Sequence, residues 1–379
     1  MFKRFLIAAL LAGAMAVTSC QRQVSYAEWE GPMELFKAGE DGYNTFRIPG
    51  MVVSKKGTVL AFAEARKNSH RDFGDIDLVV KRSEDGGRSW SDIIMVRDDG
   101  VNCCSSPTPV VLESGRILML CTWQNNEVPF HHFAIHWFTM YSDDDGLTWS
   151  KPREITLPLV EPDWIMACIG PGHAIRLEKG VHKGRIVASC YHKWERPGDR
   201  LWQGRSFYIY SDDEGQTWQR GGFAGYGGNE CMSTELANGD IMLNQREFKR
   251  WGDDIGIRYQ RLVSISKDGG ESFVDTWYDP NLPSAICEGS IIRYRHGHER
   301  DNWLLFATPT AQTRTELKVK LSKDCGQSWD PIYDGVYDKE AYSDMAELPD
   351  GSVGIIYEAG NTTSHDLLVF DIIPAAQIR

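Results

Sequence analysis

Five aspartates stand in one repeated pattern, Ser-x-Asp-x-Gly-x-x-Trp, in which Phe once replaces Trp. Carboxylates can act as general acids, bases or nucleophiles, so these side chains are the first candidates for chemistry. A residue that recurs in every repeat serves the repeat, however, whereas a catalytic site is assembled once. We therefore predict that the five carboxylates are structural. They are Asp85, Asp144, Asp213, Asp268 and Asp324.

The same pattern has the chemistry of a turn between two strands. The Asp carboxylate can accept backbone N–H bonds across the turn, and the Gly can adopt a positive φ without steric cost. Each copy follows a β-rich run such as Leu317-Lys318-Val319-Lys320-Leu321, and successive aspartates are 59, 69, 55 and 56 residues apart. That interval fits one four-stranded blade with its loops. The repeats therefore predict an all-β fold, a single closed β-propeller.

Composition and charge exclude some classes of partner. The chain has 379 residues, a formal net charge of -12 and a sequence pI of about 5.4. Because nucleic-acid binding needs a basic face, we expect no nucleic-acid partner, whereas an anionic substrate is compatible with positive charge concentrated in one pocket. Eight cysteines follow Cys20 without the spacing of metal ligands, so we expect no metal and no other cofactor.

The N-terminal residues resemble an export signal. Lys3 and Arg4 form a basic start, and residues 5–17 form an apolar stretch that is too short to span a bilayer. Val17-Thr18-Ser19-Cys20 resembles a bacterial lipobox, in which Cys20 is the acylated residue. The alternative is ordinary signal-peptide cleavage, which would leave a soluble exported protein.

These features predict the organisation of the chain. Residues 1–19 are a signal peptide, residues 20–34 are a tether that begins at the lipidated Cys20, and residues 35–379 are one propeller domain. The protein is then an exported lipoprotein, in the periplasm or at the cell surface, whose membrane contact is the lipid anchor alone. The oligomeric state is not specified by any pattern in the sequence.

Motifs that occur once carry a resemblance to a known family. Phe46-Arg47-Ile48-Pro49 resembles the F/Y-R-I-P signature that opens the catalytic domain of sialidases, also called neuraminidases. The five aspartate repeats resemble the Asp-boxes of the same family, and the likeness extends from Glu34 to the C-terminus. It implies a six-bladed propeller with four-stranded antiparallel blades. It also implies an exo-α-sialidase, a glycoside hydrolase that removes terminal sialic acid from sialylated glycans.

Sialic acid carries a carboxylate on its anomeric carbon, so its pocket needs a cationic clamp. Arginine suits this task because its planar fork can bind a carboxylate through two hydrogen bonds and stays charged. By the resemblance, the three arginines of the family correspond to Arg47, Arg246 and Arg314. A lone arginine is normally a solvated surface charge, but three arginines in the expected local contexts favour the clamp.

The same carboxylate explains the nucleophile that the resemblance implies. An attacking Glu or Asp would approach a like charge, and two charges at ~4 Å repel by roughly 4 kcal/mol in a partly screened site, whereas tyrosine is neutral until activated. Ala341-Tyr342-Ser343-Asp344 resembles the A-Y-S motif of the family and indicates Tyr342, while Glu230 matches the family's base. The implied reaction is retaining hydrolysis through a covalent Tyr342–sialosyl intermediate.

Departure of the aglycone needs a proton donor. The segment around Arg66 and Asp72 resembles the acid/base loop of the family, in which Asp72 is the general acid. Asp75 and Asp77 are close rivals for that role. By the same resemblance, Arg66 contacts a polar substituent of the sugar, and Glu358 orients Arg47 through an ion pair.

Two further functions are compatible with the same sequence. A trans-sialidase, or an enzyme that releases an anhydro-sialic acid, would use the same catalytic residues. A non-catalytic sialoglycan-binding propeller would keep only the arginine clamp, so it predicts the loss of Tyr342, Glu230 or the acid. All three of these positions are filled. The preferred linkage and the preferred sialic acid are not indicated.

Overall fold

The computed structural model describes residues 29–128, 135–194, 203–247, 259–297 and 301–379. Within this part of the chain the regular structure consists of 25 β-strands, with no helix. All the strands belong to one compact unit, Gly31–Arg379. The predicted signal peptide, residues 1–19, lies outside the described residues, as do Cys20 and most of the predicted tether. These three assignments remain predictions.

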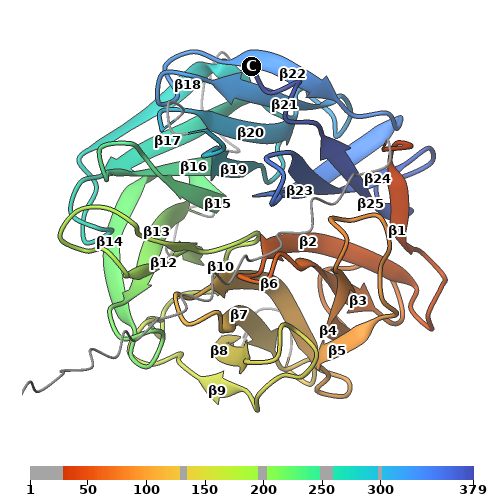
Figure 1. Cartoon of the computed structure of the whole chain (residues 1–379). Coiled ribbons are helices and arrows are strands. Elements are labelled where there is room, and N and C mark those ends of the chain that lie inside the picture. The colour runs from red at the N-terminus through yellow and green to blue at the C-terminus, as the bar shows by residue number, and fades with distance from the viewer. Residues whose placement is uncertain (1–28, 129–134, 195–202, 248–258, 298–300) are drawn as a thin grey trace, which may run out of the picture. The chain divides into compact units, whose positions relative to one another are not determined.

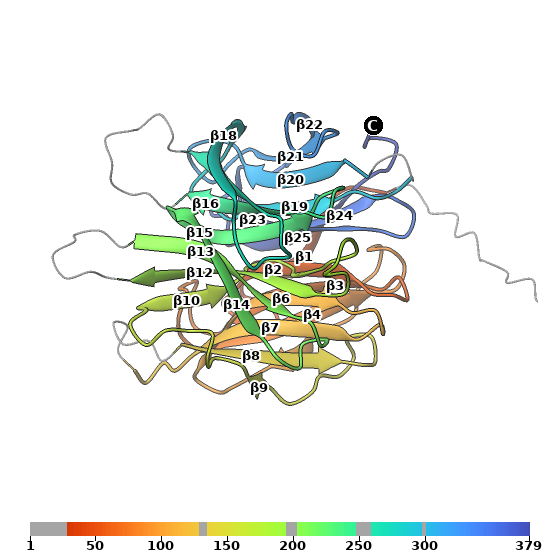
Figure 2. The same cartoon turned by 90° about the vertical axis from the view of Figure 1, so that its left-hand side faces the viewer.

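Hydrogen bonds group the strands into five sheets, which Figure 1 shows arranged around a common centre. Strands that pair are antiparallel, apart from one parallel bridge between Ile76 and Cys103. The side view in Figure 2 shows β6, β7 and β8 running side by side in this way. The unit is therefore an all-β propeller of antiparallel sheets, as the repeats predicted.

Three of the sheets have four strands each. The first contains β15 (Gly228–Glu235), β16 (Ile241–Glu247), β17 (Gln260–Ser266) and β18 (Asp275–Pro283). The second contains β19 (Ser290–Arg293), β20 (Leu304–Pro309), β21 (Leu317–Ser322) and β22 (Asp330–Asp334). The third contains β1 (Met33–Lys37), β25 (Leu367–Ile373), β24 (Val353–Gly360) and β23 (Lys339–Glu347). Because β1 pairs with β25, the first and last strands of the unit close the ring within one sheet.

The other two sheets are larger. One has five strands: β10 (Met166–Ile169), β12 (Ile186–Trp194), β13 (Gln203–Ser211) and β14 (Gln219–Tyr226), with β11 (Ile175–Arg176) beside β12. The other has eight strands: β2 (Thr45–Val53), β3 (Val59–Arg66), β4 (Ile76–Ser83), β5 (Ile94–Arg97), β6 (Cys103–Val111), β7 (Ile117–Gln124), β8 (Ile135–Ser142) and β9 (Arg153–Glu154).

The predicted count of six separate four-stranded blades is not confirmed, since the described strands form five sheets. The physical reason is the bridge between Ile76 of β4 and Cys103 of β6. This bridge joins two antiparallel runs of strands, β2 to β5 and β6 to β9, into one hydrogen-bonded sheet.

The five Asp-box turns share one hydrogen-bonding pattern. In the third turn, Asp213 accepts a bond from Ser211 Oγ at 2.7 Å, and from the backbone N–H and hydroxyl of Thr217 at 2.7 and 2.6 Å. Gly215 has a φ of 84°, and a Cβ at this position would lie 2.7 Å from Leu118 Cδ2 of the neighbouring sheet. The other four carboxylates are bound within their own turns in the same way, which confirms their structural role.

Side chains from neighbouring sheets interlock to form the core. One cluster joins Leu118 and Leu120 of β7 with Ile186 of β12 and Phe207 of β13, all at most 4% exposed. Burial of each such side chain stabilises the fold by ~1.5–3 kcal/mol. The sheets therefore pack face to face around the centre, and their inner strands lie nearest to it. The strands nearest the centre in Figure 1 are β2, β6, β10, β15, β19 and β23.

Candidate active site

Three of the central strands are irregular where a predicted site residue stands. Arg47 of β2, Glu230 of β15 and Tyr342 of β23 each lie at a shift in pairing register, which is a β-bulge. A bulge bends the strand and re-aims a side chain, so it can turn these three groups toward one another. Ile48, next to Arg47, has a φ of 54°, a strained conformation for a β-branched residue that costs ~1–3 kcal/mol.

A cavity of about 370 Å³ opens among these bulges. Its volume suits one small ligand. Seven of the eight predicted site residues line it, and the eighth, Glu358, lies behind Arg47. The seven are Arg47, Arg66, Asp72, Glu230, Arg246, Arg314 and Tyr342.

Three arginines surround the ring of Tyr342. Arg246 Nη1 donates to the Tyr342 hydroxyl at 3.0 Å. The guanidinium carbons of Arg47 and Arg314 lie 5.4 and 5.1 Å from the ring centroid. Burial lowers the pKa of Arg246, but the carboxylate of Glu230 outweighs burial and raises that pKa overall. The fold therefore brings the predicted clamp together from β2, β16 and the connection between β20 and β21.

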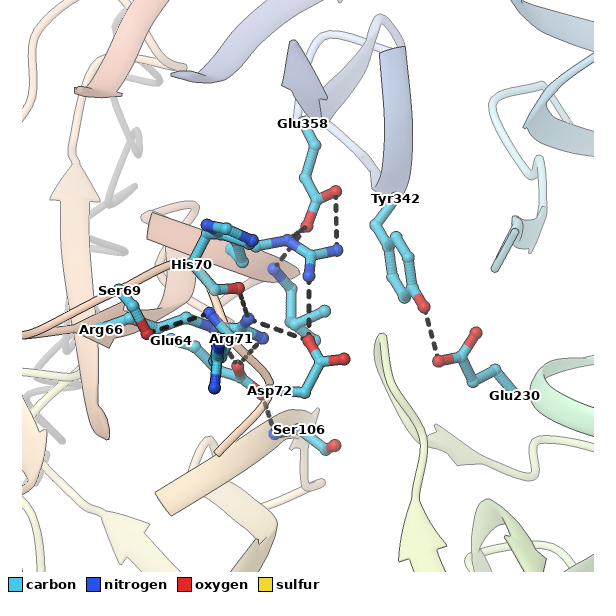
Figure 3. Close-up of polar contacts among 12 residues, drawn as sticks. Glu64, Arg66, Ser69, His70, Arg71, Asp72, Ser106, Glu230, Tyr342 and Glu358 are labelled. Atoms are coloured by element: carbon cyan, nitrogen blue, oxygen red, sulfur yellow. Dashed lines mark hydrogen bonds and ion pairs between the residues drawn. The ribbon is translucent and has the colours of Figure 1, made fainter. Parts of the chain in front are cut away.

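Tyr342 and Glu230 form a hydrogen-bonded pair, drawn in Figure 3. The Tyr342 hydroxyl donates to Glu230 Oε1 at 2.6 Å, and Arg246 donates to Glu230 Oε2. Burial and then the charge of Glu230 raise the pKa of Tyr342 well above its usual value. Burial opposes ionisation of Glu230 too, but Arg246 and the Tyr342 hydroxyl outweigh it and lower the pKa of that carboxyl. At neutral pH the pair is a phenol beside a carboxylate that can accept its proton.

Asp72 lies on the connection between β3 and β4, and its side chain is 79% exposed. Its Oδ1 atom accepts a bond from Arg47 Nη1 at 3.0 Å. The same atom accepts a bond from Arg66 Nη1 at 2.9 Å (Figure 3). Partial desolvation raises the pKa of this carboxyl, but Arg66 and then Arg47 outweigh it and hold the pKa below its usual value. Asp72 is therefore an ionised carboxylate at neutral pH in this structure.

The two rival aspartates are engaged elsewhere. Asp77 is fully buried and accepts a bond from the Tyr43 hydroxyl at 2.7 Å. Lys67 Nζ lies 3.3 Å from Asp77 and 3.4 Å from Asp75. Neither rival is among the described residues that line the cavity. Of the three aspartates, Asp72 is the one that lines the cavity among the described residues.

Each of the two arginines that bind Asp72 is held by its own buried glutamate. Glu358 accepts Arg47 Nε at 2.9 Å and Nη2 at 3.2 Å, so the ion pair that the sequence indicated is present. Glu64 Oε2 accepts Arg66 Nε at 3.0 Å and Nη2 at 2.5 Å. In both pairs the glutamate occupies one edge of the guanidinium, and Nη1 is left to bind Asp72 (Figure 3).

Sequence reasoning missed one wall of the cavity and the residue Glu64. Glu64 carried a usable signal, because it stands two residues before Arg66 on one strand, and such residues share a face. The wall formed by β7, β10 and β12 carried none, since no motif marks which strands reach the cavity. Its residues are Thr122, Gln124, Met166, Cys168, Tyr191 and Lys193.

Within the described residues there is neither a candidate metal cluster nor a disulfide. Among them, no group of three or more His, Cys, Asp or Glu side chains could hold a metal ion. The eight cysteines in this part of the chain are free thiols. In the same described ranges, no helix has the length and apolar character needed to cross a membrane.

The sequence of this chain is similar to those of known proteins. A family model described as a BNR repeat-like domain matches residues 57–355. The sialidase of Micromonospora viridifaciens is 31% identical over 342 residues, which cover 85% of this chain and 51% of that protein. The sialidase of Bacteroides fragilis is 27% identical over 356 residues, which cover 85% of this chain and 61% of that protein. The chain thus spans between half and two thirds of the length of these relatives.

Solved structures resemble the whole propeller unit. The Hadza microbial sialidase Hz136 superposes with a TM-score of 0.78 at 25% identity, over 92% of this chain and 69% of that chain. The intramolecular trans-sialidase from Ruminococcus gnavus superposes with a TM-score of 0.73 at 17% identity, over 90% of this chain and 97% of that chain. The second likeness shows a shared fold alone.

Proposed function

The chain belongs to the BNR repeat-like domain family, and we propose that it is an exo-α-sialidase. Such an enzyme is a glycoside hydrolase that removes terminal α-linked sialic acid from glycans. One observation carries the proposal: the Tyr342 hydroxyl donates to Glu230 while three arginines surround the tyrosine ring. A buried tyrosine needs one acceptor for its hydroxyl. A structural role does not require three cations around the ring, whereas an anionic substrate does.

The three arginines bind the carboxylate of the sugar. Charge-assisted bonds from a guanidinium fork are among the strongest polar contacts in proteins, at ~1.5–3 kcal/mol each. The chain as a whole has a net charge of -12, so this pocket is a local exception that selects an anion. With the carboxylate held by Arg47, Arg246 and Arg314, the anomeric carbon that bears it is fixed beside Tyr342.

Tyr342 is the nucleophile of the first step. Its oxygen attacks the anomeric carbon while its proton passes to Glu230 Oε1, 2.6 Å away. Because burial and Glu230 hold the pKa of Tyr342 high, a free phenolate is disfavoured and the proton leaves as the new bond forms. The bond from the anomeric carbon to the leaving oxygen breaks, and this oxygen takes a proton from Asp72.

The second step releases the sugar. Water gives a proton to Asp72 and attacks the anomeric carbon of the Tyr342–sialosyl intermediate. The Tyr342 oxygen leaves and takes back its proton from Glu230, so both side chains return to their starting states. Two displacements at one carbon retain the configuration of the sugar.

Asp72 must be protonated for the first step, although two arginines keep it ionised in this structure. Glu358 occupies Nε and Nη2 of Arg47, so a substrate carboxylate that binds Arg47 at Nη1 shares this atom with Asp72. Substrate binding then weakens the attraction between Arg47 and Asp72 and brings a like charge near Asp72. Both changes raise the pKa of Asp72, so substrate binding favours the protonated carboxyl that the first step requires.

A transferase, or an enzyme that forms an anhydro-sialic acid, would use the same first step. A sugar hydroxyl, or a hydroxyl of sialic acid itself, would then replace water in the second step. A propeller that only binds sialoglycans would need the clamp but not the hydrogen bond between Tyr342 and Glu230. Identification of the product separates these three alternatives.

For the architecture, we propose that the unit counts as six blades. Within the eight-stranded sheet, β2 to β5 and β6 to β9 are each four strands long. Each run also has an Asp-box between its third and fourth strands, at Asp85 and Asp144. Two such runs, with the other four sheets, make six.

For the N-terminal residues, we propose export and lipid anchoring. The basic start, the short apolar stretch and the lipobox-like segment support a signal peptide over residues 1–19, an acylated Cys20 and a tether to residue 34 ahead of the domain 35–379. The protein then lies in the periplasm or at the cell surface, where it meets sialylated glycans. Cys20→Ala should move it from the membrane fraction to the soluble fraction, and an unchanged distribution would refute the anchor.

The mechanism is tested by comparing wild type with Tyr342→Phe on a fluorogenic sialoside. A fluorinated sialic acid traps the covalent intermediate for mass spectrometry. We expect release of sialic acid by wild type, a label on Tyr342 and loss of most activity in the variant. Binding of sialosides without turnover would favour the non-catalytic alternative, and a label on another residue would refute the role of Tyr342.

A further inference from the structure

Two buried glutamate–arginine pairs converge on one carboxylate. The contacts form one chain, Glu358–Arg47–Asp72–Arg66–Glu64. Figure 3 labels Glu358, Asp72, Arg66 and Glu64. The side chain of Asp72 is 79% exposed, whereas the other four are at most 6% exposed. An exposed aspartate on a loop is normally mobile, so these two pairs must hold this one in place.

Glu64 holds Arg66 from one side and the neighbouring strand run from the other. Its Oε2 atom accepts Nε and Nη2 of Arg66, which occupies one edge of the guanidinium. Its Oε1 atom accepts the backbone N–H of Ser106 at 2.9 Å. Ser106 lies in the β-bulge of β6, with a φ of 56°, where the strand ladder is interrupted. The orientation of Arg66 is therefore anchored to β6.

With one edge occupied, Arg66 turns Nη1 toward the loop of residues 67–75. This atom donates to the carbonyl of His70 at 2.5 Å and to Asp72 Oδ1 at 2.9 Å. Arg66 thus holds the loop backbone and the Asp72 side chain at the same time. In the proposed function Arg47 shares its Nη1 atom with the substrate carboxylate, which weakens its bond to Asp72, and among the described residues it has no bond to the loop backbone to compare with that from Arg66 to His70. Arg66 therefore makes the larger contribution to the position of Asp72.

We propose that Glu64 is a positioning residue, which acts through Arg66 to hold the Asp72 carboxyl at the leaving oxygen. This inference rests on the proposed sialidase function. Glu64 is not in contact with the reacting atoms in this scheme, since both of its oxygens already accept protein donors. Without it, Arg66 loses its fixed orientation. Proton transfer then weakens, because it requires a donor–acceptor distance of ~3 Å.

The test compares wild type with the Glu64→Gln variant on two substrates. Sialyllactose has a sugar alkoxide leaving group that needs a proton, whereas the nitrophenolate of a 4-nitrophenyl sialoside departs without one. General acid catalysis contributes ~10²–10⁴-fold, so partial misplacement of Asp72 should lower kcat/KM on sialyllactose by ~10-fold or more. On the nitrophenyl substrate we expect kcat/KM to change by less than ~3-fold, because Tyr342 and Glu230 are untouched and the leaving group needs no proton. The comparison uses kcat/KM because this parameter reports the first step, whereas kcat also contains the second step, in which Asp72 is the base for both substrates.

A matched control is available at Glu235. This carboxylate is also buried, accepts the backbone N–H groups of Glu178 and Lys179, and lies 3.5 Å from the buried Arg293. It lines a separate cavity of about 670 Å³ that contains none of the predicted site residues. Glu235→Gln should therefore leave the ratio of the two kcat/KM values unchanged.

Combining Arg66→Met with Glu64→Gln removes both charges of the buried pair, so the double variant leaves neither an unpaired cation nor an unpaired carboxylate. If Glu64 acts through Arg66, then adding Glu64→Gln to Arg66→Met should cause no further loss of kcat/KM on sialyllactose. The double variant also keeps the test available if Glu64→Gln alone fails to fold.

Three outcomes have distinct meanings. A selective loss on sialyllactose, absent in the Arg66→Met background, supports the proposal. Equal losses on both substrates, or additive losses in the double variant, would overturn it. Absence of activity in wild type on both substrates would instead refute the sialidase function on which the proposal rests.

Discussion

Saturation with substrate is expected to raise the pKa of Asp72. In the structure Arg66 and Arg47 hold this pKa below the usual value of about 4, although partial desolvation opposes them. A substrate carboxylate shares the Arg47 contact, which weakens the attraction between Arg47 and Asp72, and adds a like charge, and both changes favour the protonated acid. The direction of the shift is therefore upward.

The size of this rise follows from Coulomb's law. Two unit charges 4 Å apart interact by about 1 kcal/mol in water and about 4 kcal/mol at an effective dielectric constant of 20. Because the Asp72 side chain is 79% exposed, solvent screens it and the lower figure applies. The weakening of one attraction and the gain of one repulsion then amount to about 2 kcal/mol. At 1.36 kcal/mol per pKa unit, this is roughly 1.5 units.

The shift can be read from pH–rate profiles on sialyllactose. The basic limb of the kcat/KM profile reports the pKa of the general acid in the free enzyme. The basic limb of the kcat profile reports the pKa of the same group in the enzyme–substrate complex. We expect the limb of kcat to lie roughly 1–2 pH units higher. Asp72→Asn, assayed on a 4-nitrophenyl sialoside, should show no such difference. Coincident limbs in wild type would refute the reasoning, because the attraction between Arg47 and Asp72 would then be unchanged in the complex.

Three other variants test separate parts of the molecule. Glu230→Gln removes the acceptor for the Tyr342 proton and should lower kcat on an aryl sialoside by about 10²–10⁴-fold, so activity near wild type would exclude Glu230 as the base. Asp213→Ala removes the accepted bonds of one turn and should lower the free energy of unfolding by ~1–3 kcal/mol in thermal melting, with kcat of the folded protein unchanged. Gly146→Ala places a Cβ 2.3 Å from Leu60 Cδ2 at a φ of 86°, and should destabilise the fold by ~1–3 kcal/mol. A melting temperature equal to that of wild type would contradict this last expectation.

The Asp-box turns could be predicted because their physics is local. Ser211, Asp213, Gly215 and Thr217 bond within seven consecutive residues, so the pattern alone specifies the geometry. The count of separate sheets could not be predicted in this way. It depends on one bridge between Ile76 and Cys103, two residues that no motif marks as partners.

The candidate site likewise has residues that local motifs predicted and features that depend on contacts between distant strands. Arg47, Tyr342 and Glu230 stood in motifs that resemble a family, and the structure brings them to one cavity. The bulges that turn them inward were not anticipated, because a register shift depends on the partner strand as well as on the bulged one. Glu64 was missed although its spacing to Arg66 was visible, since the role of its carboxylate depends on the backbone of Ser106 in the next strand run.

The candidate cavity lies across the seam at which the ring closes. Arg47 comes from β2, near the start of the unit, and its partner Glu358 comes from β24, 311 positions later in the chain. A chain that is still emerging from the ribosome cannot assemble this pair until nearly all of its residues have been released. Closing so long a loop loses entropy before the contact forms, so the site completes late in folding. In the proposed function, only completely folded molecules would then have hydrolytic activity. Fragments that end before β24 should be inactive.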